Sequence, residues 1–285
     1  MLIGQFWGTS AAEGIPAPFC RCDVCEEARR EGGVYQRMRS SFRLTDKIII
    51  DLGADAVSQS ARFGDLSTLE HVLITHTHED HFNPHMMMEA FWCRARGKTL
   101  HYYFTDGAYD MAENLRSVPW MLKGKVPGWE KEGIVAFHRL EYGKRYAVDD
   151  MWVTPFAGNH KGNVGELSAM YLIELPDGRV LFYGLDSGPY FEETFDALKG
   201  KHVDIFISES TDGDYPQDPS RQHLSAEGVR GVTERLLSQG TLTKESVLYL
   251  THINHSTSHG RMLKEVERLN FPIPTTVAYD GLKIL

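Results

Sequence analysis

The sequence predicts an α/β fold in which two β-sheets are covered by helices within a single domain. Short runs of apolar, β-branched or aromatic residues recur along the chain and have the length of strands. Amphipathic helical patterns lie between these runs. The 285 residues show no linker, internal repeat or low-complexity segment, so one large domain over residues 1–285 is expected.

The expected strands are the apolar runs, beginning with residues 1–7. A Pro-Asp-Gly turn at residues 176–178 predicts that the runs on either side of it form a hairpin. The other expected strands are 47–51, 71–75, 99–104, 151–154 with an extension to 156, 169–175, 179–183, 203–207 and 247–251.

Two helices carry clear capping signals. Ser225 is expected to begin a helix that ends at Gly240, and Ser258 a helix that ends before Pro272. The apolar residues of each helix recur at helical spacing and predict one buried face. These faces consist of Val229, Val232, Leu236 and Leu237 in the first helix, and of Met262, Leu263, Val266 and Leu269 in the second.

Two further helices are expected at residues 84–96 and 106–116. They fall in a region, about residues 84–130, that is rich in methionine, tryptophan and tyrosine. This composition fits an inserted helical lid, and it fits ordinary core and helix faces equally well.

The overall composition excludes some classes of protein. The formal net charge is −9 and the isoelectric point is about 5.8, which argues against a protein that wraps long nucleic acid. A small phosphate substrate stays compatible, because bound metal ions supply local positive charge. No run approaches the length of a membrane span and no signal peptide is evident, so a cytoplasmic protein without a membrane partner is expected. A homodimer is left open.

The strongest signal is the stretch Thr-His-Thr-His-Glu-Asp-His at residues 75–81, directly after an expected strand. In extended backbone the side chains of His76 and His78 point the same way and can share one metal ion. Asp80 and His81 follow where the chain turns, and they can face the same cavity and hold a second ion. Imidazole and carboxylate ligands together suit Zn, Mn or Fe.

This stretch resembles the H-x-H-x-D-H signature of the metallo-β-lactamase superfamily. The resemblance covers nearly the whole chain and implies an αββα sandwich with two mixed β-sheets flanked by helices. It also implies three further metal ligands, each at the end of a strand: His160, Asp186 and His252. By resemblance, Asp51 orients a metal ligand through a hydrogen bond. The implied division of ligands is His76, His78 and His160 for one ion, Asp80, His81 and His252 for the other, and Asp186 as the bridge.

Three of the four cysteines, Cys20, Cys22 and Cys25, lie within six residues. Such clustered thiolates favour a tetrahedral structural zinc ion, which needs a fourth ligand. His255 is the preferred candidate and His259 the second choice. Cys93 is expected to be a buried free thiol. Three reduced cysteines without a metal are the alternative.

The cysteine cluster together with the late His-x-x-His pair resembles the branch that contains the phosphoribosyl cyclic phosphate phosphodiesterase of the carbon–phosphorus lyase pathway. Residues 8–16 also resemble the glycine-bearing start of that branch. The resemblance implies a structural zinc ion and two active-site metals that split a cyclic phosphodiester through a metal-bridged hydroxide. Asp80 and His223 are the implied catalytic residues, His223 being the general acid. Arg221 either contacts phosphate or is an ordinary exposed charge.

The leading functional hypothesis is therefore a metal-dependent phosphodiesterase that acts on a small cyclic or nucleotide-like phosphodiester. The greater length around residues 86–129 sets the chain apart from that branch, so substrate selection there can differ. Three alternatives remain: an oxidative enzyme like that of pyrroloquinoline-quinone biosynthesis, a nuclease of the tRNA 3′-processing type, and a zinc scaffold without catalysis. No phosphate-binding glycine loop and no nucleophile elbow occurs in the sequence.

Overall fold

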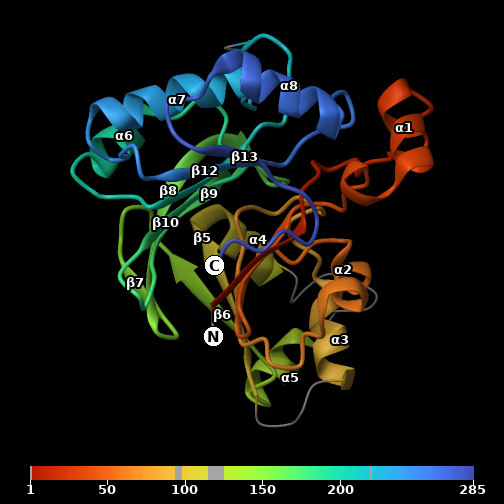
Figure 1. Cartoon of the computed structure of the whole chain (residues 1–285). Coiled ribbons are helices and arrows are strands. Elements are labelled where there is room, and N and C mark those ends of the chain that lie inside the picture. Colours follow the sequence, from red (N-terminus) through yellow and green to blue (C-terminus); the bar gives the residue numbers. More distant parts are fainter. Residues whose placement is uncertain (1, 94–97, 115–124, 219) are drawn as a thin grey trace.

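Two mixed β-sheets pack face to face in the computed structural model, which describes residues 2–93, 98–114, 125–218 and 220–285 (Figure 1). The six-stranded sheet has the order β1 (Leu2–Gly8), β2 (Ser41–Thr45), β3 (Ile48–Ile50), β4 (His71–Leu73), β5 (Leu100–Thr105) and β6 (Val135–Leu140). The seven-stranded sheet has the order β13 (Thr275–Val277), β12 (Val247–Thr251), β11 (Ile205–Glu209), β10 (Val180–Gly184), β9 (Leu167–Glu174), β8 (Met151–Lys161) and β7 (Tyr146–Val148).

Helices cover the outer face of each sheet (Figure 1). The six-stranded sheet is covered by α2 (Ala56–Phe63), α3 (His85–Cys93), α4 (Asp106–Asn114) and α5 (Val126–Lys131). The seven-stranded sheet is covered by α6 (Glu192–Leu198), α7 (Ala226–Ser238) and α8 (His259–Leu269). Helix α1 (Asp23–Glu31) and the short 3₁₀ helix η1 (Gly33–Tyr35) lie to one side of the sandwich. The order of layers is thus αββα, as the sequence predicts.

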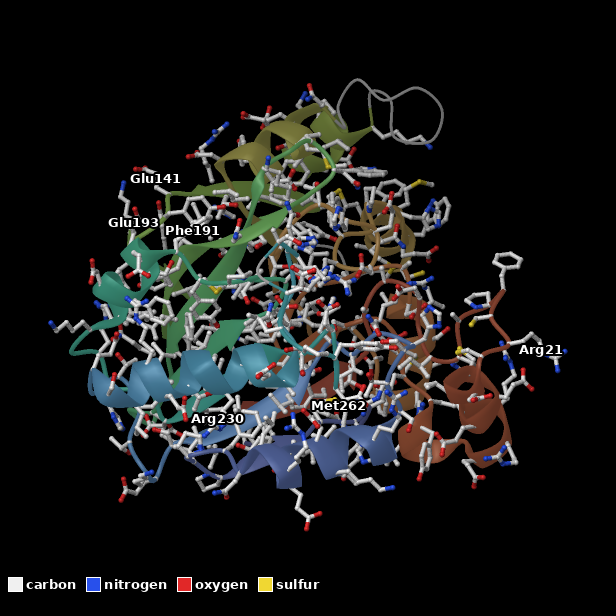
Figure 2. The ribbon with its side chains drawn as sticks, turned by 90° about the horizontal axis from the view of Figure 1, so that it is seen from above. Arg21, Glu141, Phe191, Glu193, Arg230 and Met262 are labelled. Atoms are coloured by element: carbon white, nitrogen blue, oxygen red, sulfur yellow. The ribbon has the colours of Figure 1, made fainter. Side chains whose placement is uncertain are left out.

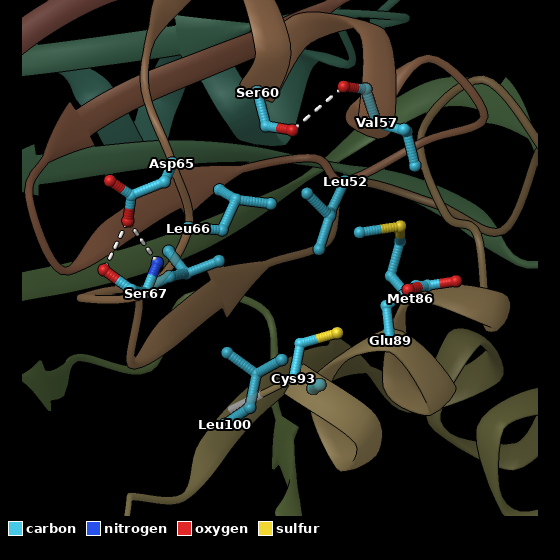
Figure 3. A pocket seen from close by; sticks show the side chains of 12 residues that line it. Leu52, Val57, Ser60, Asp65, Leu66, Ser67, Met86, Glu89, Cys93 and Leu100 are labelled. Atoms are coloured by element: carbon cyan, nitrogen blue, oxygen red, sulfur yellow. Dashed lines mark hydrogen bonds between the residues drawn. The ribbon is translucent and has the colours of Figure 1, made fainter. Parts of the chain in front are cut away.

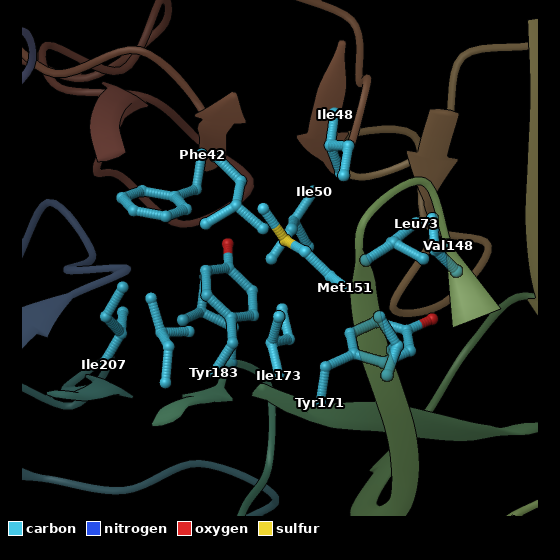
Figure 4. Close-up of a cluster of buried hydrophobic side chains, with 14 of the residues drawn as sticks. Phe42, Ile48, Ile50, Leu73, Val148, Met151, Tyr171, Ile173, Tyr183 and Ile207 are labelled. Atoms are coloured by element: carbon cyan, nitrogen blue, oxygen red, sulfur yellow. The ribbon is translucent and has the colours of Figure 1, made fainter. Parts of the chain in front are cut away.

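The main core lies between the two sheets (Figure 4). Phe42, Ile50 and Leu73 from the first sheet meet Tyr171 and Tyr183 from the second, and all five side chains are buried. The nearly continuous apolar burial of strands such as β3 and β11 follows from this position, because both faces of each sheet are covered.

Several local predictions are confirmed. The turn at residues 176–178 joins β9 and β10 as an antiparallel hairpin. The side chain of Ser225 accepts a hydrogen bond from the backbone N–H of Gly228, and that of Ser258 accepts one from Arg261. Leu263 is wrongly placed on the buried face of α8, since its side chain is 50% exposed.

Other boundaries differ from the expectation. The β4 strand ends at Leu73, so His76 and His78 lie in the loop that follows the strand and not in the strand itself. The β8 strand continues to Lys161, so His160 lies inside the strand and not after it. The expected helix ends at residues 96 and 116 fall outside the described residues. Elements without a clear sequence signal are β2, β6, β7, β13, α1, α2, α5 and α6.

The described parts of the region 84–130 form α3, β5, α4 and α5. Met87, Tyr102 and Trp129 are buried in the core between these helices and the six-stranded sheet. The interpretation of this region as an inserted lid stays a prediction. Cys93 is exposed at the end of α3, which corrects the expectation of a buried thiol.

Strand direction decides where the loops gather. Neighbours β3 and β4 are parallel, as are β10, β11 and β12. Their carboxyl ends therefore meet at one edge of the sandwich, where side chains after each strand can converge. Figure 2 shows the outlying position of Arg21, near α1, relative to Arg230 and Met262 on the neighbouring helices α7 and α8. None of the described helices combines the length and apolar character needed to cross a bilayer.

Candidate metal centre

Three histidines converge at the carboxyl edge of the sheets. His76 Nε2 lies 2.9 Å from His78 Nδ1, and His160 Nε2 lies 3.3 Å from the same His78 atom. One ligand atom from each residue falls within 4.8 Å of the other two. His76 and His160 are buried, and burial lowers the pKa of both imidazoles. Neutral imidazole is the form that binds a metal ion.

A second group lies beside the first and contains Asp80, His81, Asp186 and His252. Oδ2 of Asp186 is 2.7 Å from His81 Nε2 and 3.1 Å from His252 Nε2. The same oxygen is 3.7 Å from Nε2 of His76, which belongs to the first group. Asp186 therefore lies between the two groups, in the position that a bridging carboxylate requires.

The electrostatics of the second group attract a cation. Although burial opposes ionisation, the charges of His81 and His252 hold the pKa values of Asp80 and Asp186 below their usual range. Burial likewise opposes charge on the two histidines, but the carboxylates outweigh it, raising the pKa of His81 and bringing that of His252 to about 10. A field that draws protons onto buried imidazoles also favours a divalent cation in their place.

The hydrogen-bond pattern fits metal ligands. Among the described residues, His81 Nε2, His252 Nε2 and Asp186 Oδ1 are buried and make no aligned hydrogen bond. Buried polar atoms without partners are rare in native proteins, and a bound ion would account for them here. The donor set and the spacing of these atoms thus fit two divalent ions, as the sequence predicts.

Neighbouring side chains fix the orientation of the second group. His81 Nδ1 donates a hydrogen bond of 2.7 Å to Asp51, which also accepts from the backbone N–H of Thr75. Thr211 Oγ1 lies 2.8 Å from His252 Nδ1. In both histidines the Nδ1 atom is therefore engaged and Nε2 is left for a metal. The predicted role of Asp51 as the acceptor for a ligand agrees with this geometry.

The backbone is strained where it delivers these residues. Asp51, Asp186 and His252 all have positive φ angles, of 62°, 43° and 53°. Such angles are uncommon for residues other than glycine and occur preferentially at functional sites. Close approach also demands Gly53, because a Cβ atom at this position would lie 1.9 Å from the carbonyl oxygen of Asp80.

Glu209, at the end of β11, connects several site loops and is fully buried. Its Oε1 atom accepts from the backbone N–H groups of Ser187 and Gly188 at 2.7 and 2.8 Å. Its Oε2 atom accepts from Thr211 Oγ1 at 2.6 Å and lies 3.0 Å from His223 Nδ1. One carboxylate thus links the turn after Asp186, the partner of His252 and the predicted general acid.

His223 lies against the metal groups. Its Nδ1 atom is 3.3 Å from Asp186 Oδ1, and its ring is 4.8 Å from that of His160. Burial opposes protonation, but the charge and hydrogen bond of Glu209 outweigh it and raise the pKa of His223. Since Nδ1 is engaged by Glu209, Nε2 is the atom that can deliver a proton. His160, Asp186 and His223 also form a three-residue group of metal-ligating type, so His223 is additionally a candidate ligand.

The cysteine cluster forms a separate group. Cys20, Cys22, Cys25 and His255 come together, and His255 Nδ1 is 3.8 Å from Cys22 Sγ and 3.6 Å from Cys25 Sγ. Zinc bonds of about 2.3 Å to sulfur and 2.1 Å to nitrogen in a tetrahedron separate the two ligands by roughly 3.6 Å, so the spacing fits zinc.

The thiols of Cys22 and Cys25 differ in pKa, and His259, the second choice for the fourth ligand, has another partner. Burial opposes ionisation of Cys22, but hydrogen bonds from the backbone of Cys25 and from His255 lower its pKa to about 6. Burial raises the pKa of Cys25 to about 12. His259 does not join this group, because its Nδ1 accepts a hydrogen bond of 2.8 Å from the guanidinium of Arg37.

A cavity of about 260 Å³ opens over the metal groups. Besides the predicted ligands and His223, its wall includes Glu13, Asp212, Arg221 and Asn254. A second cavity of about 340 Å³ is largely apolar and lies beneath α2 and α3, with Leu52, Met86 and Cys93 in its wall (Figure 3). None of the residues lining this second cavity belongs to a predicted metal group.

The structure adds residues that the sequence analysis missed. Glu166 accepts hydrogen bonds from the backbone N–H of Thr77, between the two motif histidines, and from that of Val164. Glu209 and Thr211 are also new to the site. The available signal at Glu209 was an acidic residue two positions after the apolar run that ends at Ile207, a pattern common to the strands of many proteins.

The two sheets, the outer helices and the paired histidine and aspartate groups define a metal-dependent hydrolase of the metallo-β-lactamase type. A family model described as a beta-lactamase superfamily domain matches residues 46–253, and the chain belongs to this superfamily. A search of the curated proteins found no match.

Solved structures with the same fold differ widely in activity. A diphosphatase from the PhnP family is 20% identical, with a TM-score of 0.72 over 99% of this chain and 96% of the other. Zn²⁺-bound PqqB from Methylobacterium extorquens is 18% identical, with a TM-score of 0.74 over the whole of both chains. The short form of human tRNase Z is 16% identical, with a TM-score of 0.63 over 100% of this chain and 99% of the other. At these identities the similarity shows the shared fold.

Proposed function

We propose that this protein is a phosphodiesterase that uses two divalent metal ions, zinc or manganese with iron also compatible, and hydrolyses a small cyclic or nucleotide-like phosphodiester. The observation that carries the proposal is the position of His223, whose Nδ1 is held by Glu209 while the ring lies beside Asp186 and His160. A proton donor held beside two metal groups suits the cleavage of a phosphoester whose leaving group is an alkoxide.

The residues divide the work between binding and proton transfer. His76, His78 and His160 would hold one ion, Asp80, His81 and His252 the other, and Asp186 both. When bound, such a metal pair lowers the pKa of water and neutralises charge on a phosphoryl group. Glu209 raises the pKa of His223, which then gives the proton at Nε2 to the leaving alkoxide.

The cavity and the overall charge support a small substrate. A space of about 260 Å³ lies just below the usual range for small-molecule sites, which begins at about 300 Å³. The formal net charge of −9 disfavours a long RNA partner, although tRNase Z shares the fold. The similarity to a PhnP-family diphosphatase makes diphosphate esters a second substrate class to assay.

The leaving group provides a sharp test of this assignment. Metal-loaded protein would be assayed with bis(p-nitrophenyl) phosphate, whose leaving group departs without a proton, and with adenosine 2′,3′-cyclic phosphate, whose sugar alkoxide needs one. His223→Asn should lower kcat for the cyclic nucleotide by about 10²- to 10⁴-fold and kcat for the nitrophenyl ester much less. Equal losses on both substrates would remove His223 from the role of general acid.

Metal content separates the two roles open to His223. If His223 acts as an acid, His223→Asn retains the same number of ions per chain as the unaltered protein. Loss of an ion from this variant would assign His223 to the ligands instead. Turnover of none of these esters, together with redox activity of an iron-loaded form, would favour an oxidative enzyme. Metal binding without any turnover would favour a scaffold.

A further inference from the structure

The largely apolar cavity beneath α2 and α3 takes no part in the metal chemistry (Figure 3). Its buried lining side chains belong to the core between these helices and the six-stranded sheet, and they include Leu52, Leu69, Met86 and Leu100. Cys93 also lines the cavity but is exposed, so the cavity is accessible from solvent. An accessible apolar cavity with walls fixed by the core is the usual form of a small-molecule site.

The volume of the cavity limits the size of its ligand. An apolar cavity of about 150 Å³ holds one benzene molecule. At about 340 Å³, this cavity is roughly twice as large. It therefore suits an apolar body of about two fused rings, or an alkyl group of similar bulk.

The charge of the cavity wall is negative. Asp65 and Glu89 line it, and none of the described lining residues is lysine, arginine or histidine. Oδ1 of Asp65 accepts hydrogen bonds from the backbone N–H and the hydroxyl of Ser67, which lower the pKa of Asp65 and keep it ionised (Figure 3). Both bonds use Oδ1, so Oδ2 can accept from a ligand. The wall thus attracts a cation and repels an anion.

The cavity adjoins two segments that position a metal ligand. The backbone N–H of Leu52 donates to the carbonyl of His81, and its carbonyl accepts from Asn83, both at 2.9 Å. Leu52 directly follows Asp51, which holds Nδ1 of His81. The backbone N–H of Met86 donates to the carbonyl of Asn83 at 3.1 Å. A ligand in contact with Leu52 and Met86 therefore touches both segments that orient His81.

We propose that this cavity binds a small amphiphilic amine, with its apolar body against Leu52, Leu66 and Met86 and its ammonium group beside Asp65 and Glu89. The site is separate from the metal centre. The inference does not depend on the reaction that the metal centre catalyses.

Three probes with the same two-ring body test the size and the charge of the ligand. They are 1-naphthylmethylamine, 1-naphthylmethanol and 1-naphthoate, and their binding to the metal-loaded protein would be measured by calorimetry. The amine should bind about 2- to 5-fold more tightly than the alcohol, because solvent screens the carboxylates, and the anion should bind most weakly. An anion that competes for Cys93 as well as the amine does would overturn the inference.

The thiol of Cys93 reports whether a probe occupies this cavity, because it lies in the wall and not at the metal centre. At about ten times its dissociation constant, the amine should slow the reaction of Cys93 with a chromogenic disulfide reagent by about 10-fold, since only unoccupied protein reacts. An unchanged rate would place the probe elsewhere and overturn the inference. A thiol that is slow without any probe and speeds up on dilution would assign the cavity to a second copy of the chain instead.

Filling the cavity separates this site from others on the surface. Ala90→Phe places a ring in the cavity and should abolish both the binding of the amine and the protection of Cys93. Ala197→Phe, at an exposed position of α6, is the matched control and should change neither. Protection that survives in Ala90→Phe overturns the inference. If Ala90→Phe does not fold, the protection of Cys93 in the unaltered protein still decides the question.

Removal of the carboxylates tests the charge preference alone. Asp65→Asn combined with Glu89→Gln should bring the affinity for the amine to that for the alcohol and leave the affinity for the alcohol within about twofold. Glu193→Gln combined with Asp196→Asn removes two exposed carboxylates from α6 and should leave the preference for the amine intact. A preference that persists in the first double variant, or is lost equally in the second, would attribute it to the overall negative charge and overturn the assignment of an amine.

Discussion

Replacement of Glu209 by glutamine tests whether one buried carboxylate organises the catalytic loops. The side chain keeps its size but loses its charge, and one of its oxygens becomes an NH₂ group. That group must face either the N–H groups of Ser187 and Gly188 or the set formed by Thr211 and His223. About two buried donors then lack an acceptor, at about 1–3 kcal/mol each, so the free energy of unfolding should fall by about 2–6 kcal/mol.

The same change acts on His223. Without the Glu209 charge, the pKa of His223 should fall, because burial is then opposed by fewer negative charges. A general acid must be protonated, so the alkaline limb of the pH profile of kcat/KM should move to lower pH. The assay is hydrolysis of adenosine 2′,3′-cyclic phosphate between pH 5 and 10 by metal-loaded protein, beside unfolding in urea.

A double-mutant cycle with His223→Asn provides the refutation. If Glu209 acts in part through His223, Glu209→Gln should lower kcat by a smaller factor in the His223→Asn background than in the unaltered protein. Independent, additive losses in kcat, or an alkaline limb that does not move in Glu209→Gln, would refute the account of this carboxylate.

Three further predictions concern the reactivity of Cys93, the titration of His259 and the close packing of Gly53. In the metal-loaded protein one thiol per chain, that of the exposed Cys93, should react quickly with a chromogenic disulfide reagent. All four cysteines of the chain should react after chelation and denaturation. Three or more fast-reacting thiols before chelation would contradict a zinc-bound cysteine cluster. Burial and the neighbouring guanidinium lower the pKa of His259 from 6.5 to about 4, so its stabilising contribution is present above pH 6.5 and is lost as the pH falls towards 4. The stability advantage of the unaltered protein over His259→Asn in urea should therefore shrink between pH 7.5 and 4, by about 1 kcal/mol because solvent screens a half-buried group, and a constant difference would be contrary evidence. Gly53→Ala should cost about 1–3 kcal/mol of unfolding free energy and release metal on dialysis, because its Cβ meets backbone, whereas Gly231→Ala on α7, with nothing within 4 Å, should do neither.

The metal ligands could be predicted because their spacing carries information. The pair His76 and His78, followed by Asp80 and His81, is a local pattern, and each distant ligand follows or ends a strand with a clear apolar signal. The two sheets were predictable for the same reason, since strands buried on both faces appear as continuous apolar runs. His255 was preferred over His259 on spacing alone, and Arg37, which engages His259, carried no signal of this role.

The supporting residues were not predictable in this way. Glu209 and Glu166 act through contacts with other loops, and neither belongs to a motif with a recognisable spacing. Their importance arises only when strand order brings the loops together. The exposure of Leu263 and Cys93 was missed for a related reason, because helical spacing predicts a buried face but not where that face ends.

Metal content and turnover in the same preparation test the central claim most directly. The protein would be purified without chelator, its ions counted by mass spectrometry, and its activity measured on bis(p-nitrophenyl) phosphate beside the variants His78→Ala and Cys22→Ala. The account predicts about three ions per chain, loss of turnover with loss of active-site metal in His78→Ala, and loss of one ion in Cys22→Ala. A single thiolate-bound ion, with no turnover after zinc or manganese is added back, would contradict it.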